Sequence, residues 1–135
     1  MLEIAVSARL LGAPAIADPT EGRIEWMRRS DGVLPAIVLQ IISDPRPQHL
    51  KGFMSARPTR VQVDVWAASP RAAAELREAV ITVLIEPAHI EGVRFGRAQI
   101  VNVRPGFEQL EAGSDQQPRG ELYRESIDVI FTHNS

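Results

Sequence analysis

Two aspartates lie in stretches whose residue types alternate as they do in β-strands. Asp64 stands between Val63 and Val65, and Asp128 stands between Ile127 and Val129. Alternation puts each carboxylate on the face opposite the aliphatic side chains. If the two strands are neighbours, the carboxylates share a face, and such a pair suits acid–base chemistry when a pocket raises one pKa. The sequence supplies no such pocket, and aspartates on a polar strand face are mostly solvated, so an enzymatic or ligand-binding use of this pair is the less favoured interpretation.

Apart from the two aspartates, the sequence contains few residues or motifs typical of catalysis or of metal binding. The three histidines, His49, His89 and His133, are scattered, and no two have the spacing of metal ligands. The sequence contains no nucleophile elbow, no phosphate-binding loop and no dinucleotide fingerprint. Cysteine is absent, which excludes disulfides and thiolate metal sites and fits a reducing compartment. The motifs therefore predict neither an enzyme nor a bound cofactor.

Trp66 has the least ordinary position, because it shares the polar side of its strand with Gln62 and Asp64. In the last strand, Arg124 and Asp128 also lie on the polar side. Two interpretations remain open: a loop of the same chain covers Trp66, or the row belongs to a surface that contacts another subunit. Tryptophan is enriched at such interfaces and among their energetic hot spots.

A long loop carries a similar mixture of residue types. Residues 43–58 contain three prolines and no sustained period. Loops of this length are mostly functional or disordered. Phe53 and Met54 lie there close to Arg46 and Arg57, either folded back on the body or available to a neighbour. Together with Trp66, this loop favours a binding or assembly function.

The periodicities predict the order helix, strand, strand, helix, strand, strand. Glu125 interrupts the apolar side of the last strand, so we expect it near a sheet edge or beside a charged partner. Ser69 is expected to cap the second helix, which Pro70 begins. The expected helices cover 1–11 and 70–86, with a connector over 12–22 and a short extended piece over 23–26. The expected strands cover 34–43, 59–66, 93–103 with a bulge at Gly96, and 121–132, and a second long loop is expected over 107–120.

This order predicts an α+β fold. It consists of a single mixed, mostly antiparallel sheet of four to five strands, with two helices packed on one face and two long loops. Residues 1–135 have the size of one domain with its own core. The formal charge of −2 speaks against a general nucleic-acid binder. No apolar run is long enough to cross a membrane, and no secretion signal is expected at the start of the chain.

Several stretches, taken in order, resemble a known family. They are "GRIEW", "LPAIVLQIIS", "RVQVDVWAASPRAAAELREAV" and "ELYRESIDVIF". The same succession is similar to the tail-completion or tail-terminator proteins of long-tailed bacteriophages and of related particles such as gene transfer agents. The strand that runs into the alanine-rich helix, with Asp64 and Trp66, is the most specific part of the resemblance.

The resemblance implies a structural subunit without enzymatic activity or cofactor. It implies a hexameric ring at the head-proximal end of the tail, which ends growth of the tube and joins the tail to the head. Its partners would then be the major tail tube protein and the head–tail connector protein, and DNA would pass through the lumen without specific binding. Such a subunit assembles in the bacterial cytoplasm and ends in the virion. A neighbouring head–tail joining protein, a stopper or an adaptor, is the alternative within the same class. The expected assembly interface comprises Gln62, Asp64, Trp66, Arg124, Asp128, Arg46, Phe53, Met54 and Arg57.

Overall fold

The computed structural model describes residues 1–28, 33–46, 48–49, 52–53, 56–109 and 121–134. The helices are α1 (Leu2–Leu11), α2 (Pro14–Thr20) and α3 (Pro70–Ile85). The strands are β1 (Ile24–Trp26), β2 (Ala36–Ser43), β3 (Gln48–His49), β4 (Gly52–Phe53), β5 (Ala56–Ala67), β6 (Ala88–Ile90), β7 (Val93–Phe95), β8 (Gln99–Gln109) and β9 (Glu121–Asn134).

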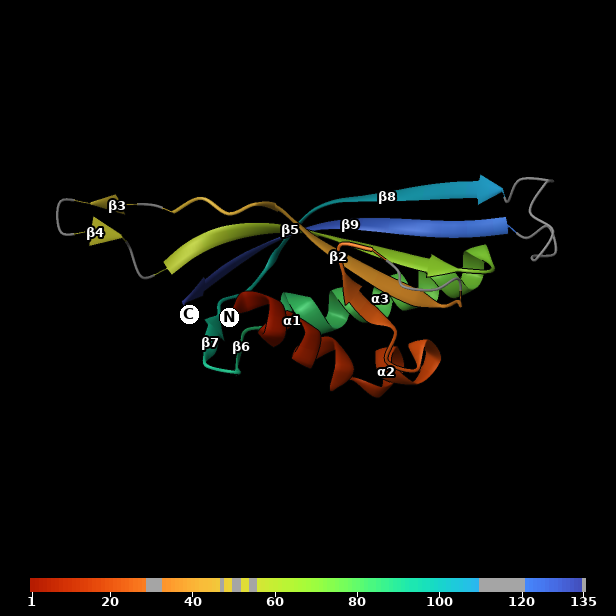
Figure 1. Cartoon of the computed structure of the whole chain (residues 1–135), viewed down its shortest axis with the longest axis horizontal. Helices are drawn as coiled ribbons and strands as arrows, with labels where there is room; N and C mark the ends of the chain where they lie inside the picture. Colours follow the sequence, from red (N-terminus) through yellow and green to blue (C-terminus); the bar gives the residue numbers. More distant parts are fainter. Residues whose placement is uncertain (29–32, 47, 50–51, 54–55, 110–120, 135) are drawn as a thin grey trace.

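The described strands form a seven-stranded sheet and a separate two-stranded one made of β3 and β4. The large sheet has the order β1-β2-β5-β9-β7-β6, and β8 pairs with β9 on the same edge as β7. The β1–β2 pair is parallel, whereas the other pairs are antiparallel. The predicted α+β class with a mixed, mostly antiparallel sheet is confirmed (Figure 1). The expected four to five strands and two helices were too few.

The missing helix is α2, which stands where the sequence predicted a connector. Pro14 occupies the first turn of α2, where its fixed φ and missing N–H cost nothing. Ile16 and Thr20, one turn apart, are buried, and the Thr20 hydroxyl donates to the Ile16 carbonyl oxygen at 2.7 Å. A helix this short buries too few side chains to produce a recognisable period, so its prolines and glycines dominated the prediction.

The strand predicted over 93–103 is two strands. The first of them, β7, ends at Phe95, and the N–H of the next residue, Gly96, donates to the Thr132 carbonyl oxygen at 2.8 Å. The irregularity expected at Gly96 as a bulge is thus a break between β7 and β8, and the register shift lies between Ile100 and Asn102. β6, which the sequence did not predict, joins β7 through a two-residue turn. Its residues Glu91 and Gly92 have φ of 52° and 75°, as a type I′ turn requires.

Three strands extend beyond their predicted ends. β5 begins at Ala56 and β9 continues to Asn134, so they pair in unbroken register from Ala56–Asn134 to Ala67–Tyr123. Part of the loop expected over 43–58 is therefore strand, and β3 and β4 lie within the same stretch. β8 likewise extends to Gln109, beyond the predicted end at Val103, while residues 110–120 of the second expected loop lie outside the described residues.

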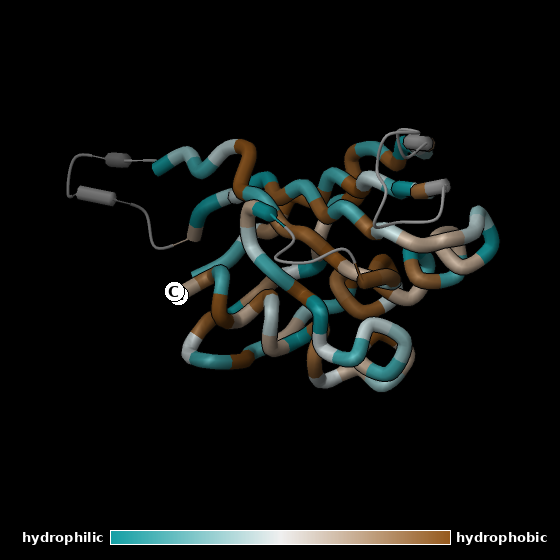
Figure 2. The backbone as a smooth tube through the Cα atoms, turned by 45° about the vertical axis from the view of Figure 1, so that its right-hand side comes forward, coloured by the Kyte–Doolittle hydropathy of each residue, from teal (hydrophilic) through white to brown (hydrophobic). Residues whose placement is uncertain are grey.

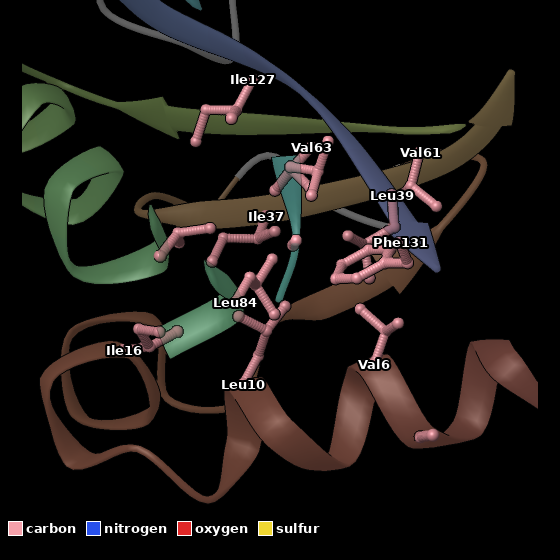
Figure 3. Packing of buried hydrophobic residues seen from close by; sticks show 14 of the residues in the cluster. Val6, Leu10, Ile16, Ile37, Leu39, Val61, Val63, Leu84, Ile127 and Phe131 are labelled. Carbon is pink, nitrogen blue, oxygen red and sulfur yellow. The ribbon is translucent and has the colours of Figure 1, made fainter. Parts of the chain in front are cut away.

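The core lies between one face of the sheet and the helices. In Figure 3, Val6 and Leu10 of α1 point toward Ile37, Leu39 and Phe131 of the strands. In Figure 2 the longest hydrophobic stretches of chain run through the middle of the molecule. All three helices contribute buried residues to this core, so among the described residues the opposite face of the sheet carries no helix. None of the helices in the described part combines the length and hydrophobicity needed to cross a membrane.

Helix α3 begins as predicted. The Ala72 N–H donates to the Ser69 hydroxyl oxygen at 3.1 Å, so Ser69 is the N-cap. On the sheet side, Arg77 donates to Glu125 at 2.9 Å, which confirms that Glu125 has a charged partner. Arg77 is consequently half-buried against the sheet.

Helix α1 is tied to the end of α3 by Arg9. The Arg9 Nη2 donates to the carbonyl oxygens of Val83 at 2.7 Å and Glu86 at 2.6 Å, where α3 ends. The carbonyls of a helix end lack partners within the helix and carry partial negative charge, so a cation is favoured there. The guanidinium also lies 4.9 Å from the centroid of the Phe95 ring. A buried arginine thus fixes the angle between the two helices.

Candidate functional site

The open face of the sheet brings together the polar residues of β5 and β9. Because Val61, Val63 and Val65 point into the core, the residues between them point to the open face. The register of β5 with β9 places Trp66 opposite Arg124, Asp64 opposite Ser126 and Gln62 opposite Asp128. The five strand residues predicted for an interface, Gln62, Asp64, Trp66, Arg124 and Asp128, therefore lie side by side, and with Arg60, Arg104 and Ser126 they form what we call the polar face.

Asp128 is the charged centre of the polar face. Only 4% of Asp128 is exposed, and its Oδ2 accepts hydrogen bonds from Arg60 Nη2 at 2.9 Å and Arg104 Nη1 at 3.1 Å. Burial alone raises the pKa of Asp128, but the hydrogen bonds and charges of the two arginines outweigh it, so its pKa lies below the ordinary value. The other carboxylate oxygen, Oδ1, is buried and has no hydrogen-bond partner among the described residues.

Asp64 is held by neutral groups. The Ser126 hydroxyl donates to Asp64 Oδ1 at 2.6 Å, and the Gln62 amide nitrogen lies 3.1 Å from both carboxylate oxygens. Ser126 is itself buried. The two aspartates thus lie on one face, as the alternation predicted, but each has its own set of donors.

Trp66 and Arg124 form the third contact of the polar face. The Arg124 guanidinium carbon lies 5.4 Å from the centroid of the Trp66 ring, within the range of a cation–π contact. Trp66 is half-buried, and its cross-strand neighbour on the other side is Ala36 of β2. Opposite Arg124 in β8 stands Gly106, where a Cβ would lie 2.9 Å from Arg124 Nη2. A glycine at this position leaves room for the arginine to lie across the sheet.

A second polar cluster lies where β2 ends and β5 begins. Asp44 accepts from Arg46 at 2.7 Å and Arg57 at 3.1 Å, and the Thr59 hydroxyl donates to it at 2.8 Å. The pKa of Asp44 is raised by burial and lowered more strongly by these three donors, with a net decrease. Arg46 and Arg57, predicted as interface residues, are therefore paired within the chain. Phe53 lies in β4, its side chain is outside the described residues, and so is the whole of Met54.

This cluster continues to a buried histidine. His133 Nε2 lies 2.8 Å from the Thr59 oxygen, and 1% of His133 is exposed. Since the single hydroxyl proton of Thr59 goes to Asp44, His133 donates through Nε2–H. Burial lowers the pKa of His133, as does the charge of Arg57, which favours the neutral ring.

The chemistry of these clusters does not fit the two-carboxylate enzyme. A general acid needs a raised pKa, whereas the pKa of Asp128 is lowered by its arginines. In the described part of the chain, no group of three or more histidine, aspartate or glutamate side chains has the geometry to hold a metal ion. What the polar face does offer is a set of fixed donors, acceptors and an aromatic ring.

The comparisons with known proteins decide the family. The family model "Tail completion protein gp17" matches residues 4–133. The chain belongs to this family. The resemblance predicted from the sequence is thereby confirmed, and the protein has a structural function in completing the tail of a phage-type particle.

Solved structures add the fold of this tail-completion protein. It is similar to a chain of the "Virion of native gene transfer agent (GTA) particle" with a TM-score of 0.63 and 14% sequence identity, covering 99% of this chain and 95% of that chain. At this identity the match shows a shared fold. No curated protein matches the chain.

The interface predicted from the sequence omitted three members of the polar face. Arg60 and Arg104 bind Asp128, and Ser126 binds Asp64. Arg60 and Ser126 share the polar side of their strands with the predicted residues, so the alternation alone contained this signal. Arg104 depends on the pairing of β8 with β9 across a register shift, which no local pattern specifies.

Proposed function

We propose that the protein is the tail terminator of a long-tailed phage-type particle. Six copies form a ring at the head-proximal end of the tail, where the ring ends growth of the tube. The ring contacts the major tail tube protein on one side and the head–tail connector protein on the other. Residues 1–135 supply one domain per subunit, and neither a cofactor nor catalysis is involved.

The observation that carries this proposal is the tail-completion family model, which matches nearly the whole chain. The shared fold with a chain of a gene transfer agent virion supports the same class of particle. Assembly takes place in the bacterial cytoplasm, and the finished subunit resides in the tail or neck of the virion.

Within the ring, we assign contacts with neighbouring proteins to the polar face. Its side chains are already held in place by Asp64 and Asp128, so binding a partner costs little additional ordering. Trp66 with its Arg124 neighbour provides the aromatic and cationic residue types that are enriched at interface hot spots. The loop residues Phe53 and Met54 are proposed to extend this surface.

The charge of the polar face suits protein partners. Among the described residues it contains three arginines, Arg60, Arg104 and Arg124, and two aspartates, so its charge is nearly balanced. A strongly basic surface would bind the phosphates of DNA and slow its passage. The chain as a whole has a formal charge of −2, which suits a lumen through which DNA passes without specific binding.

Electron microscopy of particles from a deletion strain tests the function. A terminator predicts tails of uncontrolled length and heads without tails. Tails of normal length that remain unattached would instead indicate a stopper or an adaptor. Normal particles would refute a function in tail completion.

Complementation of the same strain tests the polar face. Trp66→Ala and Arg124→Ala should fold and yet fail to restore joined particles. Thr82→Ala, an exposed position on α3, is the matched control and should restore them. If the Trp66 and Arg124 variants restore particles as well as the control does, the polar face is not a contact surface.

A further inference from the structure

Glu125 is a carboxylate on the side of β9 that otherwise faces the core. Its neighbours on that side, Ile127, Val129 and Phe131, are fully buried, and the side chain of Glu125 is 12% exposed. Burying a charged group is costly unless it has partners. The polar face does not use Glu125, because the residue points to the opposite side of the sheet. This carboxylate therefore has a position that neither the core nor the polar face explains.

Arg77 of α3 satisfies Glu125 in part. Its Nη1 donates to Glu125 Oε1 at 2.9 Å, and its Nε donates to Glu78 Oε2 at 2.9 Å. One cation is thus shared between two carboxylates, which leaves one negative charge in excess in this group. Among the described residues, the Glu125 carboxylate accepts this one hydrogen bond, so its Oε2 still lacks a donor.

A pocket of about 360 Å³ opens beside Glu125. It lies between the start of α3 and the strands β8 and β9. In the register of these two strands, Phe107 stands opposite Tyr123 and Pro105 stands opposite Glu125. Two aromatic rings and a carboxylate therefore share one side of the sheet. The lining comprises Pro70, Pro105, Gly106, Phe107, Tyr123 and Glu125.

The aromatic rings of the pocket are fixed although one of them is exposed. Phe107 packs on Tyr123 with ring centroids 5.2 Å apart and an interplanar angle of 49°. Nevertheless, 54% of Phe107 is exposed, and among the described strands β8 pairs only with β9, so none of them covers this ring. A ring that is already held in place can bind a ligand with little cost in ordering.

The chemistry of the lining matches a guanidinium group. A planar cation is attracted to the faces of aromatic rings, and its N–H groups pair well with a carboxylate. The ammonium group of lysine is more strongly hydrated and fits such a pocket less well. An apolar ligand would leave Glu125 without its second donor. The start of α3 adds a partial positive charge of about half a unit, which is smaller than the excess negative charge.

We propose that this pocket binds an arginine side chain of a neighbouring protein in the particle. The neighbouring protein as partner rests on the function proposed above, whereas the affinity of the pocket for arginine does not. The pocket lies on the helix side of the sheet, so it can be occupied while the polar face contacts another protein.

An NMR titration of the purified chain with N-acetylarginine amide tests the pocket. Glu125→Gln should weaken binding by at least about tenfold, because a hydrogen bond to a charged group contributes that much. Phe107→Leu keeps an apolar side chain but removes the ring, and should weaken binding about threefold. The matched control is Glu75→Gln, which makes the same change at an exposed carboxylate of α3 and should bind as the wild type does.

N-acetylnorleucine amide, which has an uncharged side chain, is the control ligand and should not bind. Equal binding of the two amides would show an apolar site and would overturn the proposal. Absence of arginine binding would overturn it too, as would binding that Phe107→Leu leaves unchanged. Thermal melting checks the fold of each variant, and the exposed Phe107 gives a decision even where loss of the Arg77–Glu125 pair unfolds the chain.

Complementation of the deletion strain tests the partner. Phe107→Arg places a cation of the chain itself beside Glu125, so it should exclude the partner's arginine and fail to restore joined particles. Thr82→Arg adds the same charge at an exposed position of α3 and should restore them. Full restoration by Phe107→Arg would overturn the protein partner. If the deletion strain makes normal particles, the function in tail completion falls, and the titration still decides whether the pocket binds arginine.

Discussion

Replacing Asp128 by asparagine removes the charged centre of the polar face and keeps its shape. Breaking one partner of a fully buried ion pair costs about 3–5 kcal/mol, whereas an exposed pair contributes about 0–1 kcal/mol. The side chain of Asp128 is 5% exposed, but Arg60 and Arg104 are 38% and 47% exposed, so solvent screens both pairs. We therefore expect Asp128→Asn to lower the free energy of unfolding by about 1–3 kcal/mol at pH 7.

The pH dependence of this stability loss distinguishes the effect of the charge of Asp128 from the effect of its shape. The pKa of Asp128 is lower in the folded protein than in the unfolded chain, so its contribution is complete above the unfolded pKa. It disappears as the pH falls through the folded value, because the protonated carboxyl no longer pairs with the arginines. The difference in stability between wild type and Asp128→Asn should then be largest at neutral pH and should shrink toward about pH 3.

Urea unfolding of both proteins at several pH values provides the measurement. Glu75→Gln is the matched control, because it makes the same chemical change in the exposed Arg71–Glu75 pair and should alter stability little. A difference between wild type and Asp128→Asn that stays constant down to pH 3 would refute the electrostatic explanation. It would leave only the loss of local packing or hydrogen-bond geometry.

Three further substitutions test other contacts. Trp66→Ala should lower the free energy of unfolding by less than about 2 kcal/mol in urea titrations, because Trp66 is half-buried. Truncating a fully buried tryptophan to alanine costs about 3–5 kcal/mol, so a loss of that size would show that Trp66 belongs to the core. Arg9→Met should lower the free energy of unfolding by about 2–4 kcal/mol in the same measurement, because two carbonyl oxygens at the end of α3 lose their charged donor. An unchanged stability would contradict the capping function of Arg9. Thr59→Val keeps the shape of the side chain but removes the hydroxyl that links Asp44 to His133, so thermal melting should show a stability lower by about 1–3 kcal/mol. A variant more stable than wild type would contradict this expectation.

The sequence predicted the long, regular elements well because their periods are unambiguous. β5 alternates through Val61, Val63 and Val65, and α3 has both a capping serine and a proline in its first turn. The same alternation placed Asp64 and Trp66 on the open face, and the structure confirms this position. The local residue pattern was enough to predict an element and its buried side wherever one side of that element faces the core.

The short elements were not predicted, and the reason is physical. A strand of three residues such as β6 has no period, and the turn at Glu91 and Gly92 is its one local signal. The function of Arg9 is equally hidden, because an arginine on a helix is normally solvated and only the end of α3 gives it a buried partner. Such contacts join residues distant in the chain, and a single sequence does not reveal them.

The division of the sheet into two faces has a consequence for assembly. The core face and the helices already bury the large aliphatic residues, so the subunit does not need a neighbour in order to fold. The polar face offers little apolar surface, so we expect each of its proposed contacts with a partner to be weak on its own. A weak contact repeated around a ring becomes strong once a template holds the copies at high effective concentration. For the terminator proposed above, we therefore expect a subunit that is monomeric in dilute solution and closes its ring on the finished tube, where tail growth has to stop.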